Sequence, residues 1–154
     1  MSTLSARIDL PATPRSVVAA RRGLRELLCA WGAPQDRADA ELLATELVAN
    51  VVDHVGGEES LTLEVSLTGE WLRIAVIDGS AIRPVVRELS QVRPRGRGLQ
   101  MISAIATRWG VDDHLGGKRV WLDLLPAAPA AGLPPRPRGD GSGDRDRQTK
   151  ESSR

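Results

Sequence analysis

The chain has 154 residues, enough for one domain with a hydrophobic core and too few for two once its polar tail is set aside. Its 21 basic and 20 acidic residues are interspersed, which argues against a surface for nucleic acid, and no apolar run is long enough to cross a membrane. Cys29 is the single cysteine, so an internal disulfide is excluded. We therefore expect a cytoplasmic protein that has neither nucleic acid nor a membrane as its partner.

Composition divides the chain into two parts. From Pro126 onward, Pro, Gly, Arg, Asp and Ser dominate, and no large apolar residue follows Leu133. Such a segment cannot bury enough apolar surface to offset the entropy lost on ordering. We expect a folded domain over residues 1–126 and a disordered tail over residues 127–154.

The first half of the domain is predicted to contain one strand and two helices. Residues 6–10 have the pattern of a short strand. A helix begins at Pro14 and ends before Gly32, because proline suits the first helical position and glycine the position after the last. A second helix spans about residues 36–55, with leucine and valine repeating at helical spacing.

The second half begins with an alternating strand over residues 61–68 and continues with an inner, mostly apolar strand over 71–77. Apolar residues recurring at helical spacing predict a third helix that reaches from Leu99 to Trp109. A closing strand covers about residues 120–124. The predicted order is β α α β β α β β, in which the strand before the closing one is given no residue range. This order is typical of an α/β two-layer pattern.

A polar stripe on the second predicted helix consists of Glu46, Asn50, Asp53 and His54, which fall at helical spacing beside the apolar face. The simplest interpretation is a solvated face. The alternative is a functional site, because apolar neighbours surround Asn50 and a carboxamide oxygen is a suitable ligand for Mg²⁺.

Two further segments have the composition of a ligand site. Asp78 and Gly79 end the inner strand, where a carboxylate can accept a hydrogen bond from an exocyclic amine, although an aspartate that begins a turn is equally common there. Residues 93–98 read Arg-Pro-Arg-Gly-Arg-Gly and precede the third helix. Backbone N–H groups at a helix start, together with arginine and glycine, are typical of a phosphate site.

Competing motifs fail on their context. The glycines around Gly98 lack the third glycine of a dinucleotide fingerprint, because Met101 stands there, and Gly117-Lys118 precedes a strand instead of the helix that a Walker loop needs. The two histidines and one cysteine are too scattered for a zinc site. Arginines of the first helix lack the interleaved aromatic residues expected for nucleic-acid stacking.

Four segments, in order and spacing, resemble the ATP-binding boxes of the GHKL ATPases: residues 46–50, 78–80, 96–99 and 117–121. More narrowly, residues 4–125 resemble the anti-sigma regulatory factor serine kinase branch. The resemblance implies the two-layer α/β sandwich of the histidine kinase and gyrase type. It also implies a mixed sheet with helices on one face, and an ATP pocket closed by a lid at about residues 80–98.

The same resemblance assigns roles to individual residues. Asn50 would bind Mg²⁺, Asp78 would hold the adenine amine, and Glu46 would act as general base toward a serine hydroxyl of a partner. Other candidates for contact with ATP are Asp53, His54, Gly79, Ser80, Arg95, Gly96, Arg97, Gly98 and Leu99.

The resemblance thus implies an ATP- and Mg²⁺-binding regulator that phosphorylates or sequesters a sigma factor or an anti-anti-sigma antagonist, with a homodimer left open. Three positions depart from the family pattern: Ser80 and Ile82 replace glycines of the adenine box, and Arg119 replaces a frequent threonine. A catalytically inactive, nucleotide-dependent protein-binding module is therefore the alternative to a protein serine/threonine kinase.

Overall fold

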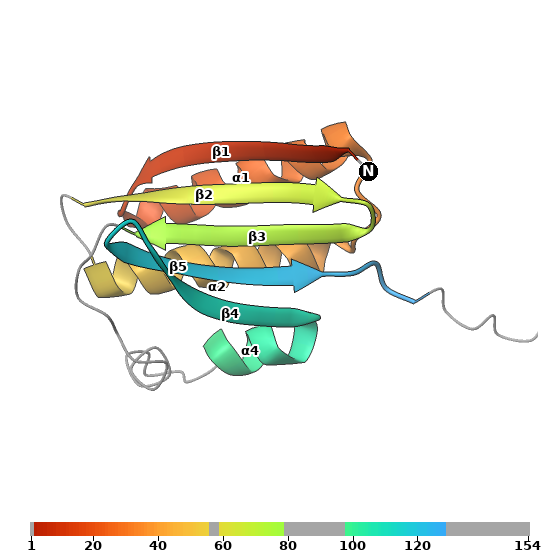
Figure 1. Cartoon of the computed structure of the whole chain (residues 1–154). Coiled ribbons are helices and arrows are strands. Elements are labelled where there is room, and N and C mark those ends of the chain that lie inside the picture. Colours follow the sequence, from red (N-terminus) through yellow and green to blue (C-terminus); the bar gives the residue numbers. More distant parts are fainter. Residues whose placement is uncertain (1, 56–58, 79–97, 129–154) are drawn as a thin grey trace, which may run out of the picture.

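The structure is a computed structural model that describes residues 2–55, 59–78 and 98–128. Most of the expected lid and the tail from residue 129 onward lie outside the described residues. The order of elements agrees with the sequence prediction, and the α/β two-layer sandwich is confirmed (Figure 1). The elements are β1 (Thr3–Pro11), α1 (Pro14–Trp31), α2 (Arg37–Val55), β2 (Ser60–Thr68), β3 (Trp71–Asp78), α4 (Gly98–Ile105), β4 (Arg108–His114) and β5 (Gly117–Leu124).

One layer is a five-stranded sheet in the order β1-β2-β3-β5-β4, and the other layer is formed by the helices. Helices α1 and α2 lie side by side behind the sheet in Figure 1, and α4 packs against α2 near β4. In the described part of the chain, no helix is long and apolar enough to span a bilayer.

The expectation of a mixed sheet is wrong, because every described strand pair is antiparallel. The connection from β1 to β2 contains two helices, and each reverses the direction of the chain. The chain therefore returns as an antiparallel neighbour, whereas a single crossover helix would give a parallel one. The pairs β2–β3 and β4–β5 are hairpins, which are antiparallel by construction.

Local sequence signals explain where the two long helices begin and end. Pro14 is the first residue of α1, and Gly32 closes that helix in the left-handed conformation with φ of 59°. Glycine adopts this conformation without the steric cost that a Cβ brings. Asp36 caps α2, because its Oδ1 accepts a hydrogen bond of 2.9 Å from the backbone N–H of Asp39.

Alternation along the strands decides which sheet face is buried. In β2 the apolar residues are buried and the polar ones are partly exposed, as the sequence predicts. The buried set of β2 packs with apolar side chains of the other strands, α1 and α2 into one core. Its largest fully buried members are Leu24, Leu28, Leu43, Leu61, Leu63, Leu72, Ile74, Ile102 and Leu122.

A buried amide attaches the start of α2 to the sheet. Gln35, which is only 4% exposed, lies between α1 and α2. Its Nε2 donates hydrogen bonds to the backbone oxygens of Glu70, at 2.6 Å, and Leu124, at 3.0 Å. These bonds fix the beginning of α2 against the β2–β3 turn and the end of β5.

The third helix is shorter than its apolar pattern predicts. Helix α4 ends at Ile105, and Trp109 belongs to strand β4. Trp109 keeps a contact with the helix through its indole Nε1, which donates to the hydroxyl of Ser103 at 3.2 Å. The helical spacing of Trp109 thus reflects packing beside α4, while its backbone pairs with Leu122 of β5.

Gly110 of β4 lies under the ring of Trp121 of β5, and a substitution can test this contact. A Cβ at this position would lie 2.7 Å from Cζ2 of Trp121, closer than packing allows. We expect Gly110→Ala to lower the free energy of unfolding by about 1–3 kcal/mol, because the ring would have to shift. The measurement is urea unfolding followed by far-UV circular dichroism.

Gly23→Ala serves as the matched control. Its added Cβ would meet Cδ1 of Ile8 at 2.8 Å, the mobile end of a flexible side chain, and alanine favours the helix. We expect a change within about 1 kcal/mol. Equal destabilisation by both substitutions would contradict the proposed contact between Gly110 and the Trp121 ring.

Candidate functional site

Helix α2 presents the polar stripe that the sequence predicts. Glu46, Asn50 and His54 are half-buried, whereas Asp53 is exposed. The adjacent face of the helix is buried in the core through Ala40, Leu43, Ala44, Leu47, Val48 and Val51. The stripe is therefore at the margin of the core, where polar groups are partly shielded from water.

Asp78 is the last residue of β3 and is only 2% exposed. Its side chain belongs to the sheet face that the helices cover, because Leu72, Ile74 and Val76 precede it at a period of two. Helix α2 packs against β3. A carboxylate buried at this place can accept hydrogen bonds from a ligand held between the sheet and α2.

Lys118 of β5 is a site residue that sequence reasoning missed. It pairs in register with Asp78, its Nζ lies 3.9 Å from Asp78 Oδ2, and it is 4% exposed. Burial lowers its pKa from the ordinary 10.5, and the charge of Asp78 acts in the opposite direction. The alternation of β5 was the available signal, because it groups Lys118 with Val120 and Leu122 on the covered face.

Arg119 lies on the other side of the sheet from Asp78. Its guanidinium is 3.5 Å from Glu64, on the face that α1 and α2 leave open. The resemblance implies a threonine at this position, but the side chain of Arg119 is directed away from the covered face. The basic group beside Asp78 is that of Lys118.

The elements that carry several of the predicted residues come together at one end of the sheet. The end of α2, the end of β3 and the start of β5 lie at the same end of the sheet in Figure 1. Gly98 and Leu99 begin α4, which packs against α2. Gly79, Ser80, Arg95, Gly96 and Arg97 lie outside the described residues.

The donor groups on α2 suit a magnesium ion that is bound together with phosphates. Asn50 offers one carboxamide oxygen, and Glu46 stands one helical turn before it. Mg²⁺ usually takes few protein ligands and completes its shell with water and phosphate oxygens. No group of three or more His, Cys, Asp or Glu that could hold a metal occurs within residues 2–55, 59–78 and 98–128.

Comparison with known proteins identifies the family. The sequence pattern of the histidine kinase-like ATPase domain matches residues 10–124, from the end of β1 to the end of β5. The chain belongs to this family. Membership confirms the expected resemblance to the GHKL ATPases, and a nucleotide-binding domain is what the family name describes.

One solved structure is similar over most of the chain. It contains the RsbU and RsbW domains of Rv1364c from Mycobacterium tuberculosis, with 24% sequence identity and a TM-score of 0.62. The match covers 85% of this chain and 35% of that chain, so the two share the fold over about a third of the larger molecule. No match is found among curated proteins.

The lowered pKa of Lys118 predicts a dependence of stability on pH. Between the folded-state pKa and the ordinary value of 10.5, the unfolded chain holds a proton that the folded chain has released. Stability contributed by this position therefore rises with pH in that window, by up to about 1.4 kcal/mol per pH unit.

Urea unfolding at several pH values from 7 to 10.5 would measure this effect, with Lys118→Met as the reference. The difference in unfolding free energy, wild type minus variant, should increase with pH. Lys150 is the only other lysine and is present in both proteins. If this difference in unfolding free energy stays constant or falls as pH rises, the pKa of Lys118 is not lowered in the folded protein.

Proposed function

We propose that this chain is an ATP- and Mg²⁺-binding regulator of the anti-sigma factor serine kinase type. Its partner would be a sigma factor, an anti-anti-sigma antagonist or both, and the setting would be a bacterial signalling switch in the cytoplasm. Family membership supports nucleotide binding, and the similar structure contains an RsbW domain. The kinase activity, the metal and the partner are parts of the proposal.

The observation that carries the proposal is the placement of Asp78 and the α2 stripe. Asp78 is buried at the end of β3, and α2, with Glu46 and Asn50, packs against that strand. A nucleotide held between them would meet an acceptor for its adenine amine and, on α2, an oxygen ligand for its magnesium ion. Gly98 and Leu99, at the start of α4, would contribute backbone N–H groups to the phosphates.

The chemistry assigned to Glu46 follows from its distance to Asn50 along the helix axis. Glu46 precedes Asn50 by one turn, about 6 Å along the axis. Its carboxylate would stand close to the terminal phosphate and outside the metal shell. In that position it could accept the proton of a partner's serine hydroxyl as the hydroxyl oxygen attacks the γ-phosphorus, with ADP as the leaving group.

A protein-binding module without phosphotransfer is the second candidate, and Lys118 favours it. The ammonium group 3.9 Å from Asp78 competes for the carboxylate that would hold adenine. Weaker adenine contact would lower nucleotide affinity. In this alternative, the bound nucleotide sets the affinity for a partner and no phosphate is transferred.

Asn50→Ala tests metal-dependent binding. We expect the variant to lose at least about tenfold of its ATP affinity in Mg²⁺, because a metal ligand is removed from a helix position that alanine suits. Calorimetric titration with ATP, with and without Mg²⁺, measures the effect. Thr45→Ala is the control, since it also removes a half-buried polar group from α2. Unchanged affinity in Asn50→Ala would refute the assignment of the metal ligand.

Glu46→Gln tests the proposed base. Gln keeps the size and helix fit of Glu but cannot accept the proton, so we expect a rate loss of about 10²- to 10⁴-fold with nucleotide affinity nearly unchanged. The assay is transfer of labelled phosphate from ATP to a serine of a partner isolated by pull-down.

The two candidate functions give different results in this assay. If the wild type transfers phosphate and Glu46→Gln transfers it equally fast, Glu46 is not the base. If the wild type binds both ATP and the partner without any transfer, the binding module replaces the kinase. Serine-to-alanine substitution in the partner is the control for the modified residue.

A further inference from the structure

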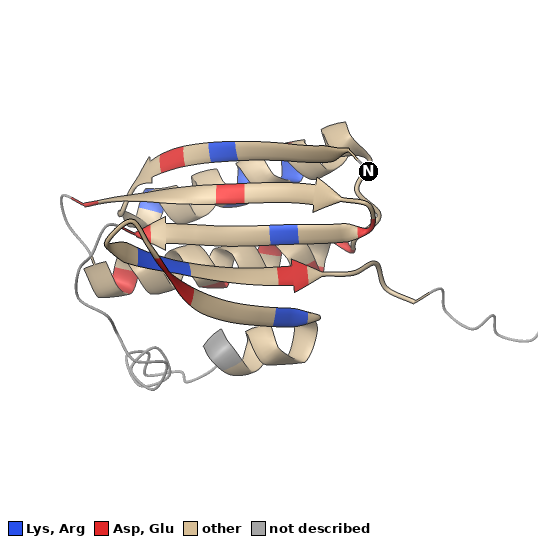
Figure 2. Cartoon of the chain, in the orientation of Figure 1, with Lys and Arg blue, Asp and Glu red and all other residues tan. Residues whose placement is uncertain are grey.

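The sheet face opposite α1 and α2 carries charged side chains in paired clusters. Figure 2 colours the acidic and basic residues along all five strands of the sheet. Register and alternation place Arg7, Glu64, Arg73, Arg119 and Asp123 there. None of these residues belongs to the candidate nucleotide site, which lies on the covered face.

A hollow of about 400 Å³ opens on this face between β1 and β5. Small residues, Ser5, Ser66 and Ala75, form its floor, and Ser5 and Ser66 face each other in the β1–β2 pair. Longer side chains from the neighbouring positions form the walls. The walls are formed by Arg7, Arg73 and Arg119. Glu64 also lines the hollow and contributes a carboxylate.

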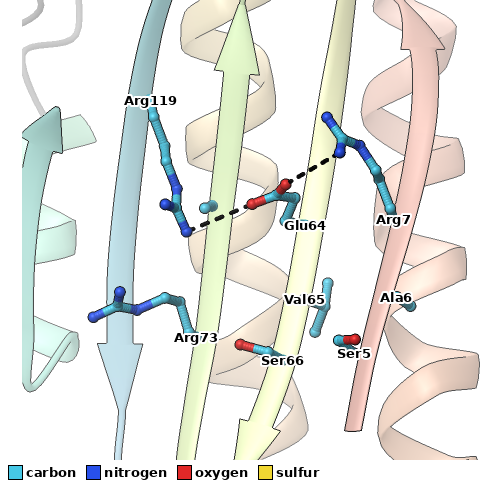
Figure 3. A pocket seen from close by; sticks show the side chains of 9 residues that line it. Ser5, Ala6, Arg7, Glu64, Val65, Ser66, Arg73 and Arg119 are labelled. Atoms are coloured by element: carbon cyan, nitrogen blue, oxygen red, sulfur yellow. Dashed lines mark ion pairs between the residues drawn. The ribbon is translucent and has the colours of Figure 1, made fainter. Parts of the chain in front are cut away.

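Glu64 stands between two arginines, as Figure 3 shows. Its carboxylate lies 3.8 Å from Arg7 and 3.5 Å from Arg119, distances at which the ion pairs are loose. Nε of Arg119 is buried and has no hydrogen-bond partner within the described part of the chain. A buried donor without an acceptor is costly, and a ligand that supplies one would be favoured.

A second cluster adjoins the hollow. Asp123, 2% exposed, accepts hydrogen bonds from Arg73 at 2.7 and 2.8 Å and from Arg108 at 2.6 Å. Burial would raise the pKa of Asp123, but these hydrogen bonds outweigh it and hold the pKa below the ordinary value. The two guanidinium groups also stack on indole rings, at 4.4 Å from Trp121 and 4.3 Å from Trp71.

The two clusters together contain more positive than negative charge. Each holds one carboxylate between two arginines: Glu64 between Arg7 and Arg119, and Asp123 between Arg73 and Arg108. Asp9 and Asp112 are on the two edge strands and do not line the hollow. Arginine and tryptophan are the residue types that most often dominate protein-binding surfaces.

We propose that this hollow is a second binding site, which takes the carboxylate side chain of an acidic segment of a partner protein. Arg7 and Arg119 form the binding pair, because both have N–H groups to spare and a guanidinium fork matches a carboxylate. The serine hydroxyls of the floor add donors. Trp71 and Arg108 extend the contact surface beside the hollow.

Binding of a synthetic acidic peptide tests the proposal. The probe is an amidated hexaglutamate, titrated by calorimetry into the full chain at low salt and without nucleotide. We expect Arg7→Gln/Arg119→Gln to weaken binding about tenfold or more. Arg21→Gln/Arg22→Gln is the matched control, since it removes the same charge from exposed positions of α1.

Glu64→Gln should change the affinity for the peptide in the opposite direction. This substitution removes the carboxylate that competes with the ligand, so the peptide should bind about fivefold more tightly, as expected for one repulsive charge at about 4 Å in water. A residue that only stabilised the sheet would not increase affinity when changed. If the double variant does not fold, the single variant Arg7→Gln can be measured in its place, because Arg7 is exposed at the rim of the hollow.

Four outcomes would overturn the proposal. They are no binding to wild type, equal weakening in the α1 control, no gain in Glu64→Gln, and binding of free glutarate as tight as that of the peptide. The last result would assign the hollow to a small carboxylate metabolite. Asn50→Ala should bind the peptide like wild type, so this test is independent of the proposed function.

Discussion

The whole structure depends on burying one face of a single antiparallel sheet under two helices. Leucine, isoleucine and valine at every second strand position meet the apolar sides of α1 and α2, and this contact forms the core. The period of two then directs the intervening residues to the other face. Because the same strands supply both faces, a residue's position along a strand decides whether it meets the helices or the opposite surface.

Lys118 and Arg119 illustrate this constraint. They are neighbours in sequence, yet Lys118 lies beside Asp78 on the covered face and Arg119 lies beside Glu64 on the open face. The proposed nucleotide site and the proposed acidic-peptide site are thus separated by the thickness of one sheet. β3 contributes to both, through Asp78 on one side and Arg73 on the other.

The sequence predicted the fold class, the order of elements and the position of the α2 stripe, because helix ends and strand alternation are local signals. Other features depended on partners distant in the chain. Trp109 has helical spacing but pairs with β5, and the polar pattern of Asp112 and Asp113 left strand β4 without a predicted residue range. The antiparallel sheet followed from the two-helix connection, and Lys118 became significant only when register placed it opposite Asp78. The predicted roles of the site residues remain predictions.

The pairing of β1 with β2 has a consequence for the order of folding. Thr3 and Thr68, which face each other in this pair, are 65 residues apart, whereas β2–β3 and β4–β5 close through short turns. Closing such a long loop costs more entropy than closing a hairpin. On the ribosome, β1 emerges before β2 exists, and both helices are made in the interval. The strand with the earliest place in the chain therefore waits longest for its partner, and the backbone N–H and C=O groups on that edge of β1 stay unpaired until β2 arrives.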